Sequence, residues 1–429
     1  MAFLLFTLLT ATLFIRPGEI FPALQGFEFF FYLFMPCFLM SFEALMAQLS
    51  WRNLRTQPIT LCVFGLLLAD VASNLAHFNI AGVMDHGVSS LKNVMYYLLL
   101  VSSVNTPVRL RKLFFWIWFF ALLFIVLVLL QHHGIIQLSM KETLNDDYLS
   151  ETGERVAVKR MTGSGLFADP NDMCMVIITG VILSFYCMAD RLFPLPRLLY
   201  WLAVITFGYA LQQTQSRGGF IALMAACGVT LLARFGWKKA AMAGAAGLPF
   251  ILILFKGRLT SISTKESTAH SRIGLWSDGL EFFKSNPIFG IGSGMYHILD
   301  RHVAHNAYVH AYAEMGIFGG GLFVGAVFFA LWAIFRLGKV RTAITDINLR
   351  HAQPFMMALV AGNATLYMTI SQTYYMSTYM LFGLVTAYLR LTDAPKILGY
   401  RMNSALAKRL SFATIAFLIG IYVFVQKYK

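Results

Sequence analysis

The sequence predicts an all-α, polytopic integral membrane protein, and three observations support this fold class. Of 429 residues, 58% are hydrophobic and only 13% are charged, whereas roughly a quarter of the residues in soluble domains are charged. The mean hydropathy is +0.66. Many apolar runs approach the ~20 residues that a membrane-crossing helix needs. Because lipid-facing helices are apolar on all sides, we expect a bilayer to surround most of this chain.

The apolar runs predict about 12 transmembrane helices, within a range of about 11–13, because several runs are short for a full crossing. No internal repeat or separate soluble domain is evident, so residues 1–429 are expected to form a single transmembrane domain. The runs lie near residues 2–15, 28–47, 58–76, 89–105, 113–131, 171–189, 198–212, 218–233, 240–255, 314–335, 353–372, 374–391 and 410–426.

The net charge of +14 follows the expected topology rather than a nucleic-acid surface. Alternate loops carry nineteen Lys and Arg against three Asp (Asp190, Asp346 and Asp393), whereas the opposite loops are balanced. The positive-inside rule places the basic set in the cytoplasm, and no nucleic-acid partner is expected. The basic set comprises Arg52, Arg55, Arg109, Arg111, Lys112, Arg191, Arg197, Arg234, Lys238, Lys239, Arg336, Lys339, Arg341, Arg350, Arg390, Lys396, Arg401, Lys408 and Arg409.

Two loops on the non-cytoplasmic side are long, at residues 131–170 and 256–313. Long connections are uncommon unless they are functional or disordered, and neither loop has a low-complexity composition. Apolar and polar residues alternate in the second loop around Trp276 and Leu280, which favours a helix at the membrane interface. We therefore expect folded caps, with the larger loop partly helical and carrying the catalytic candidates.

Arginines at the outer ends of predicted spans form the first group of candidate site residues. Arg217 follows Gln215 and Ser216 at a predicted helix mouth, where free backbone N–H groups and the helix dipole favour anions. Arg272 and Arg160 lie in the two long outer loops. A guanidinium is a good phosphate ligand, so three of them on one face suggest a diphosphate site. Snorkelling or solvated surface arginines are the alternative.

Histidines form the second group, centred on His305-Asn306 and His310. A neutral imidazole with a pKa near 6.5 can take a proton from a hydroxyl, and a carboxylate at helical spacing could orient it. Together with His297 and His302, these histidines also suggest a metal site. Their irregular spacing and the lack of an adjacent carboxylate pair argue against it, so no metal or cofactor is expected. Histidines that only hydrogen-bond within the loop remain a further alternative.

The glycines at 290, 292 and 294 favour a tight turn that returns the loop to the membrane, since no predicted strand precedes them as in nucleotide-binding motifs. A transporter without chemistry is a separate alternative. Transporters place ionisable groups at the bilayer midplane. Here the candidates lie at span ends, and the plausible in-membrane charges are Glu28, Glu43, Asp70 and Lys92.

Several motifs, in this order and on one topological side, resemble the O-antigen ligase and polymerase superfamily of bacterial membrane glycosyltransferases. Ser216-Arg217-Gly218-Gly219 resembles the family's Ser-Arg-Gly signature. Arg272 with Trp276, followed by the segment 286–292, is similar to the start of the family's large loop. His305-Asn306, nine residues and then Gly316-x-x-Gly319 resemble the His-x-x9-Gly pattern of the ligases. Residues 163–171 look like the segment ahead of a central span, and the resemblance covers roughly residues 155–390.

This resemblance implies a GT-C-like fold and an O-antigen ligase of the bacterial inner membrane with its active site facing the periplasm. The implied reaction moves O-polysaccharide from undecaprenyl diphosphate to a sugar hydroxyl of lipid A-core, without metal or cofactor. His305 is the implied base, and Arg217 and Arg272 are the implied diphosphate ligands. An O-antigen polymerase or a protein O-oligosaccharyltransferase with the same donor are the alternatives. The expected substrate-binding residues are Arg160, Asn306, Ser216, His310 and Gln215.

Overall fold

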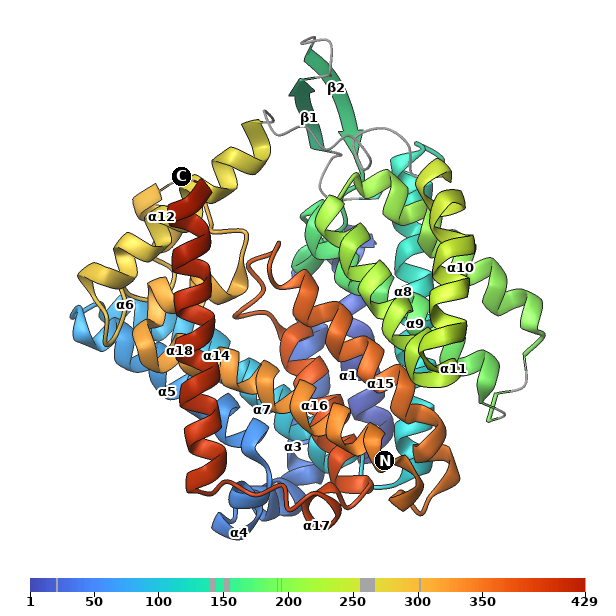
Figure 1. The fold of residues 1–429 in the computed structure, drawn as a ribbon, viewed down its shortest axis with the longest axis horizontal. Helices are drawn as coiled ribbons and strands as arrows, with labels where there is room; N and C mark the ends of the chain where they lie inside the picture. Colours follow the sequence, from blue (N-terminus) through green and yellow to red (C-terminus); the bar gives the residue numbers. More distant parts are fainter. Residues whose placement is uncertain are drawn as a thin grey trace. The chain divides into compact units, whose positions relative to one another are not determined.

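The computed structural model describes residues 1–20, 22–138, 144–149, 155–190, 192–193, 195–254, 267–300 and 302–428 (Figure 1). Contacts divide the chain into two compact units. Unit 1 comprises Met1–Phe42, Ser103–Thr264 and Val340–Leu366, and unit 2 comprises Glu43–Ser102, Lys265–Lys339 and Tyr367–Lys429. Each unit therefore contains segments that are far apart in the sequence.

Unit 1 packs around helix α9, most of whose residues are buried. Helix α9 begins where Asp169 accepts a hydrogen bond from the Asn171 N–H and Pro170 occupies the first turn, both typical of helix starts. Helices α8, α10, α11 and α15 contact it. The unit comprises α1 (Ala2–Phe14), α2 (Pro17–Ile20), η1 (Pro22–Leu24), most of α3 (Phe29–Gln48), α8 (Pro107–His132), β1 (Leu144–Leu149), β2 (Arg155–Arg160), η3 (Gly165–Phe167), α9 (Pro170–Ala189), α10 (Arg197–Thr214), α11 (Arg217–Leu254), η4 (Arg341–Ala343) and α15 (Ile347–Leu366).

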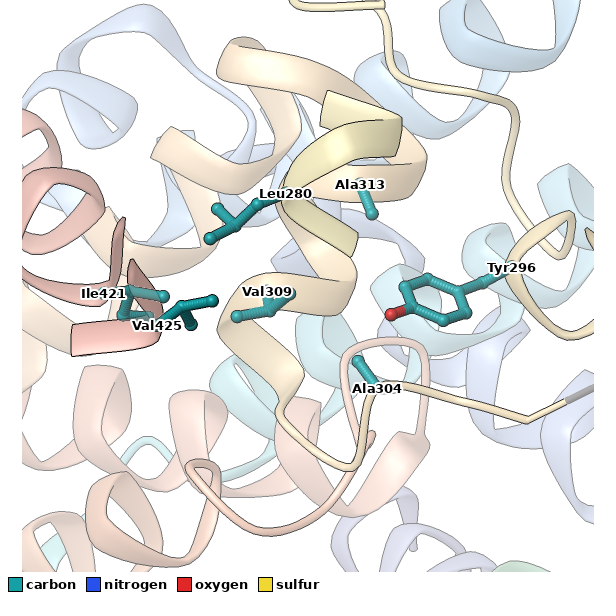
Figure 2. Close-up of a cluster of buried hydrophobic side chains, with 7 residues drawn as sticks. All are labelled: Leu280, Tyr296, Ala304, Val309, Ala313, Ile421 and Val425. Atoms are coloured by element: carbon teal, nitrogen blue, oxygen red, sulfur yellow. The ribbon is translucent and has the colours of Figure 1, made fainter. Parts of the chain in front are cut away.

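Unit 2 is built on helix α14, which packs along α5 and contacts α12, α16 and α18. A hydrophobic cluster joins α12, α14 and α18 and includes Leu280, Val309 and Val425 (Figure 2). The unit comprises α4 (Trp51–Thr56), α5 (Pro58–Ala76), α6 (Ile80–Gly82), η2 (Val83–Gly87), α7 (Val88–Ser103), α12 (Ser267–Ser285), α13 (Tyr296–Asp300), α14 (Ala307–Lys339), α16 (Met376–Leu391), α17 (Ala394–Ile397) and α18 (Ser404–Tyr428).

The predicted fold class, an all-α polytopic membrane protein, is confirmed. Each predicted apolar run coincides with a helix, and two runs share α11, which is broken at Gly236 (φ 77°, ψ 170°). Among the described residues seven helices are long and apolar enough to cross a membrane. Helices α7 and α16, of 16 residues each, fall below that length. The count of about 12 and the single-domain organisation stay predictions.

The first long loop contains an antiparallel hairpin in which Leu144 of β1 pairs with Arg160 of β2 (Figure 1). The sequence analysis assigned no strand to this loop. Val156 and Val158 in β2 are β-branched residues of the kind that strands favour, but a run this short gives little signal beside the apolar helices. The second loop contains α12 and α13, which confirms its partly helical character; residues 255–266 and 301 lie outside the described part of the chain.

Contacts within each unit join segments that were predicted to lie on the same side of the membrane. In unit 1, Arg111 at the start of α8 forms an ion pair with Asp190 after α9 at 2.6 Å, and both belong to the basic loop set. In unit 2, the Met402 N–H donates to the Arg55 carbonyl at 2.8 Å. These contacts agree with the alternation that the charge pattern predicts.

Candidate functional site

The turn between α10 and α11 in unit 1 holds the Ser216-Arg217 motif. Gln215 ends α10 in the left-handed region (φ 52°), which reverses the chain direction sharply. Ser216 caps α11, because its Oγ accepts a hydrogen bond from the Gly219 N–H at 3.1 Å. Arg217 is therefore the first residue of a long helix and is half-buried. Backbone N–H groups and the positive end of the helix dipole at this position favour an anion.

Arg160, at the end of β2, is buried against this turn. Its Nε donates to the Thr214 carbonyl at 2.9 Å and its Nη2 donates to Asn171 Oδ1 at 3.2 Å. Ser216 Oγ donates to the same Asn171 oxygen at 2.7 Å. The structure thus brings together two of the predicted site residues, Arg160 and Ser216, through a third side chain.

Asn171 is a residue that the sequence analysis did not include among the site residues. Its Nδ2 donates to Asp169 Oδ1 at 2.9 Å while its Oδ1 accepts from Arg160 and Ser216. The sequence Asp169-Pro170-Asn171 is the signal that could have identified Asn171, because an Asp before a Pro marks a helix start. Asn171 therefore connects Arg160 of the first long loop with Ser216 at the mouth of α11 through hydrogen bonds.

In unit 2, a hydrogen bond joins the helix that bears Arg272 to the segment before His305. Arg272 lies half-buried on α12, and Trp276 follows it by four residues, so both side chains lie on the same face of the helix. Trp276 Nε1 donates to the Ala304 carbonyl at 3.0 Å. The face of α12 that bears Arg272 is therefore the face that contacts the chain directly before His305.

His305 has a backbone conformation that is uncommon for a residue other than glycine. Its φ is 45°, and its side chain is partly exposed between the buried residues Ala304 and Asn306. A left-handed conformation costs a non-glycine residue roughly 1–3 kcal/mol and occurs most often at functional sites. Among the described motif residues other than glycine, Gln215 also has a positive φ.

Asn306, predicted to bind substrate, serves as the cap of α14 in the structure. Its Oδ1 accepts hydrogen bonds from the N–H groups of Tyr308 at 3.1 Å and Val309 at 3.2 Å. The side chain is fully buried, and its Nδ2 has no hydrogen-bond partner among the described residues. The Ala307 N–H donates to the Tyr367 carbonyl at 2.8 Å and holds the same turn from the other side.

His310 contacts Glu314, the carboxylate that lies at helical spacing from the histidine motif. Its Nε2 lies 3.1 Å from Glu314 Oε2, both side chains are buried, and the Tyr296 ring stacks on the imidazole at 5.4 Å. Glu314 Oε1 also accepts from the Tyr296 N–H at 3.0 Å. His297 and His302 are exposed. Within the described ranges, no three His, Cys, Asp or Glu side chains gather as metal ligands would.

The glycine turn at 290–294 packs directly on the backbone of α14, which confirms its interpretation as a tight turn. The Ile291 N–H donates to the Ala313 carbonyl at 3.0 Å, and the Ile317 N–H donates to the Pro287 carbonyl at 2.8 Å. Gly290 has φ 72°, and a Cβ there would lie 2.3 Å from the Glu314 carbonyl. Helix α14 is broken at Gly316 (φ 64°, ψ −159°), where the turn inserts its own backbone groups.

Asp70 is a second buried acid near this turn and was considered before only as an in-membrane charge. It is 1% exposed on α5, close enough to Glu314 and His86 for their charges to act on it. Ser73, one turn further along α5, donates to the Glu314 carbonyl at 2.5 Å. Ionisable residues inside a membrane protein mark functional or structural centres, and Asp70 and Glu314 lie in the same polar centre of unit 2.

These features define an all-α, multi-pass membrane protein that carries polar, cation-bearing groups at the ends of its helices. Residues 202–324 match the family model described as O-antigen ligase, and this segment contains Ser216, Arg217, Arg272 and His305. This match covers part of the chain and supports membership of the O-antigen ligase family, with a function of the ligase or polymerase type. A comparison with curated proteins found no match.

Proposed function

We propose that this chain is an O-antigen ligase that transfers O-polysaccharide from undecaprenyl diphosphate to a sugar hydroxyl of lipid A-core. The family match supports the reaction class, and the charge asymmetry of the loops supports a bacterial inner-membrane protein with its site on the periplasmic face. The observation that carries the proposal is the hydrogen bond from Trp276 to the Ala304 carbonyl, which joins the helix of Arg272 to the residue directly before His305.

In this proposal His305 is the general base. Its imidazole takes the proton of the acceptor hydroxyl while the acceptor oxygen forms a bond to the anomeric carbon of the donor glycan. The bond from that carbon to the diphosphate oxygen breaks, and undecaprenyl diphosphate leaves. His305 suits this role better than His310, because His305 is partly exposed whereas His310 is buried.

The arginines are proposed to stabilise the charge that develops on the leaving diphosphate, with no metal required. Arg217 and Arg272 are the two arginines proposed for this role. Fixed cations aimed at developing charge supply the largest part of many rate enhancements. Arg160, Ser216 and Gln215 would shape the mouth of α11 for the donor; His310 and Asn306 would support His305.

The decisive experiment measures transfer by the purified full chain from undecaprenyl-diphosphate-linked glycan to lipid A-core in the presence of EDTA. His305→Ala is expected to lower the rate about 10²–10⁴-fold, the usual range for a general base. The matched control is His297→Ala, an exposed histidine of the same loop. A His305→Ala rate within roughly tenfold of the unmodified protein would contradict the base assignment.

The products of the same assay distinguish the proposed reaction from its rivals. Glycan-capped lipid A-core supports the ligase. Longer lipid-linked chains without capping would identify an O-antigen polymerase instead, and glycan attached to an added acceptor peptide would identify a protein O-oligosaccharyltransferase. Activity that disappears in EDTA and returns with a divalent cation would overturn the metal-independent mechanism.

Cysteine labelling tests the proposed sidedness. Ser285 in the larger loop and Thr342 in a basic loop are both exposed. A membrane-impermeant maleimide is expected to label Ser285→Cys from the periplasmic side and to leave Thr342→Cys unlabelled until the membrane is opened. The reverse pattern would remove the periplasmic site from the proposal.

A further inference from the structure

A cavity of about 230 Å³ lies in unit 2 at the N-terminal end of α5, away from the polar centre described above. Helix α5 contributes Ile59 to this cavity, and Ser73 of the same helix contacts α14. Because these residues are 14 positions apart, about 21 Å of helix separates the cavity from the polar centre. The cavity is lined by Gln48, Asn53, Thr56, Gln57, Ile59, Thr386, Leu389, Arg390, Asp393, Pro395, Lys396, Tyr400 and Arg401.

One wall of the cavity is a connected set of polar side chains. Gln57 Nε2 donates to Gln48 Oε1 at 3.2 Å, and Gln57 Oε1 accepts from Thr60 Oγ1 at 3.0 Å. The set continues through Tyr97, whose hydroxyl lies 2.7 Å from Thr60 and donates to Thr386 Oγ1 at 2.9 Å. These bonds fix the wall, so the cavity has a defined shape.

Tyr400 provides an unsatisfied donor in the cavity. The side chain is 2% exposed, and its hydroxyl has no hydrogen-bond partner within the described part of the chain. Its ring stacks on Trp332 with the centroids 5.7 Å apart, and the nearby Met402 N–H is bound to the Arg55 carbonyl. Burying a hydroxyl without a partner is unfavourable, which indicates a position built to bind an acceptor.

The charge of the lining is positive, since Arg390, Lys396 and Arg401 face one carboxylate, Asp393. Asp393 pairs with Lys396 at 2.9 Å in a largely exposed position. The cavity is smaller than the roughly 300–1,000 Å³ of sites for drug-sized ligands, so it suits one compact anion rather than a glycan chain. Ile59 and Leu389 add apolar surface beside the polar wall.

We propose that this cavity binds the phosphate group of an anionic phospholipid headgroup. Guanidinium groups match the geometry of phosphate oxygens, and the Tyr400 hydroxyl would donate to one of them. The cavity lies where α5 begins and α16 ends, among loops of the basic set, which is the level at which headgroups of the cytoplasmic leaflet lie. The apolar residues would contact the start of the acyl chains.

The test measures binding of short-chain phosphatidylglycerol and phosphatidylcholine to the purified full chain in detergent, by calorimetry and by native mass spectrometry. Phosphatidylglycerol is expected to bind at least tenfold more tightly. Arg401→Gln is expected to weaken it about 10–100-fold, as for loss of a charge-assisted hydrogen bond, and Tyr400→Phe about 3–10-fold. Tyr400→Phe keeps the ring that stacks on Trp332, so it remains informative if Arg401→Gln does not fold.

Lys408→Gln is the matched control, because it removes the same charge from an exposed residue of α18. Equal weakening by Lys408→Gln and Arg401→Gln would show that surface charge alone attracts the lipid and would overturn the proposal. Equal affinity for the two lipids would do the same. Glycerol phosphate that binds as tightly as phosphatidylglycerol, with the same dependence on Tyr400, would assign the cavity to a soluble phosphate compound instead of a lipid.

Discussion

Trp276 Nε1 and the Ala304 carbonyl oxygen lie 3.0 Å apart, and their hydrogen bond fixes the residue directly before His305 to helix α12. On its other side, His305 is followed by the capping residue Asn306. A left-handed backbone conformation at His305 is thus held between two anchored neighbours. Strain of this kind persists only where the surroundings determine the conformation.

Trp276→Phe is expected to lower the transfer rate about tenfold while leaving the thermal stability nearly unchanged. The substitution keeps the aromatic ring in the cluster of α12 and removes only the donor to Ala304; a net loss of about 0.5–1.5 kcal/mol is usual for one hydrogen bond. Single-turnover rates and thermal unfolding in detergent measure the two effects. Trp201→Phe on the exposed face of α10 is the control, and an equal rate loss in both variants would count against a positioning role.

Arg272→Ala and Arg217→Ala are each expected to lower transfer about 10²–10³-fold, as removal of one oxyanion donor does in other enzymes. Lysine at either position should restore little activity, because an ammonium lacks the bidentate fork of a guanidinium. Rates of transfer at equal protein levels provide the measurement. If both alanine variants retain full activity, the arginines do not bind the diphosphate.

Gly290→Ala is expected to prevent folding or to destabilise the chain by several kcal/mol. The new methyl group would collide with the Glu314 carbonyl in addition to the cost of φ 72°. Gly399→Ala separates the two effects, since Gly399 has φ 62° and nothing within 4 Å of its added Cβ; it should cost only about 1–2 kcal/mol. Yield and unfolding temperature report the difference, and equal losses would refute the collision.

Asp190 gives unit 1 a pH dependence of known sign. Burial raises the pKa of its carboxyl, but hydrogen bonds from Arg111, Tyr186 and the Leu192 N–H outweigh burial and leave this pKa below its ordinary value. The stabilisation is therefore complete above the unfolded pKa of about 3.9 and is lost as the pH falls through the lower folded value.

Asp190→Asn should cost about 1.5–3 kcal/mol at pH 7, as expected for hydrogen bonds to a charged group, and should reduce the loss of stability between pH 5 and pH 3. Unfolding temperatures across this range are the measurement. Asp278→Asn, at an exposed residue of α12, is the control. An unchanged acid-induced loss in Asp190→Asn would exclude the ion pair as its source.

Much of the fold could be predicted because apolar length is a strong signal. The segment 58–76 predicts a span, and α5 has those bounds as Pro58–Ala76. The hairpin Leu144–Leu149 with Arg155–Arg160 could not be predicted in the same way, because strands of six residues carry no comparable hydrophobic pattern. The gap between the predicted runs 218–233 and 240–255 contains Gly236, where α11 is non-helical, although the two runs belong to one helix.

The site was predictable in its residue types and less so in its contacts. Motif spacing singled out Ser216 and Arg160, but only the structure shows that Asn171 joins them. Helical spacing offered Glu314 to the histidine motif without indicating that His310 would contact it. Such pairings depend on which helix faces turn toward each other, and this is fixed by tertiary packing that the local sequence does not encode.

The break at Gly316 has a consequence for biogenesis. The first N–H group after the break, that of Ile317, is satisfied by the Pro287 carbonyl from the preceding loop. An unsatisfied backbone group costs several kcal/mol in a bilayer. The part of α14 that follows Gly316 therefore needs the folded loop as its cap. This helix therefore reaches its final structure only when the loop that contains Pro287 folds back onto it.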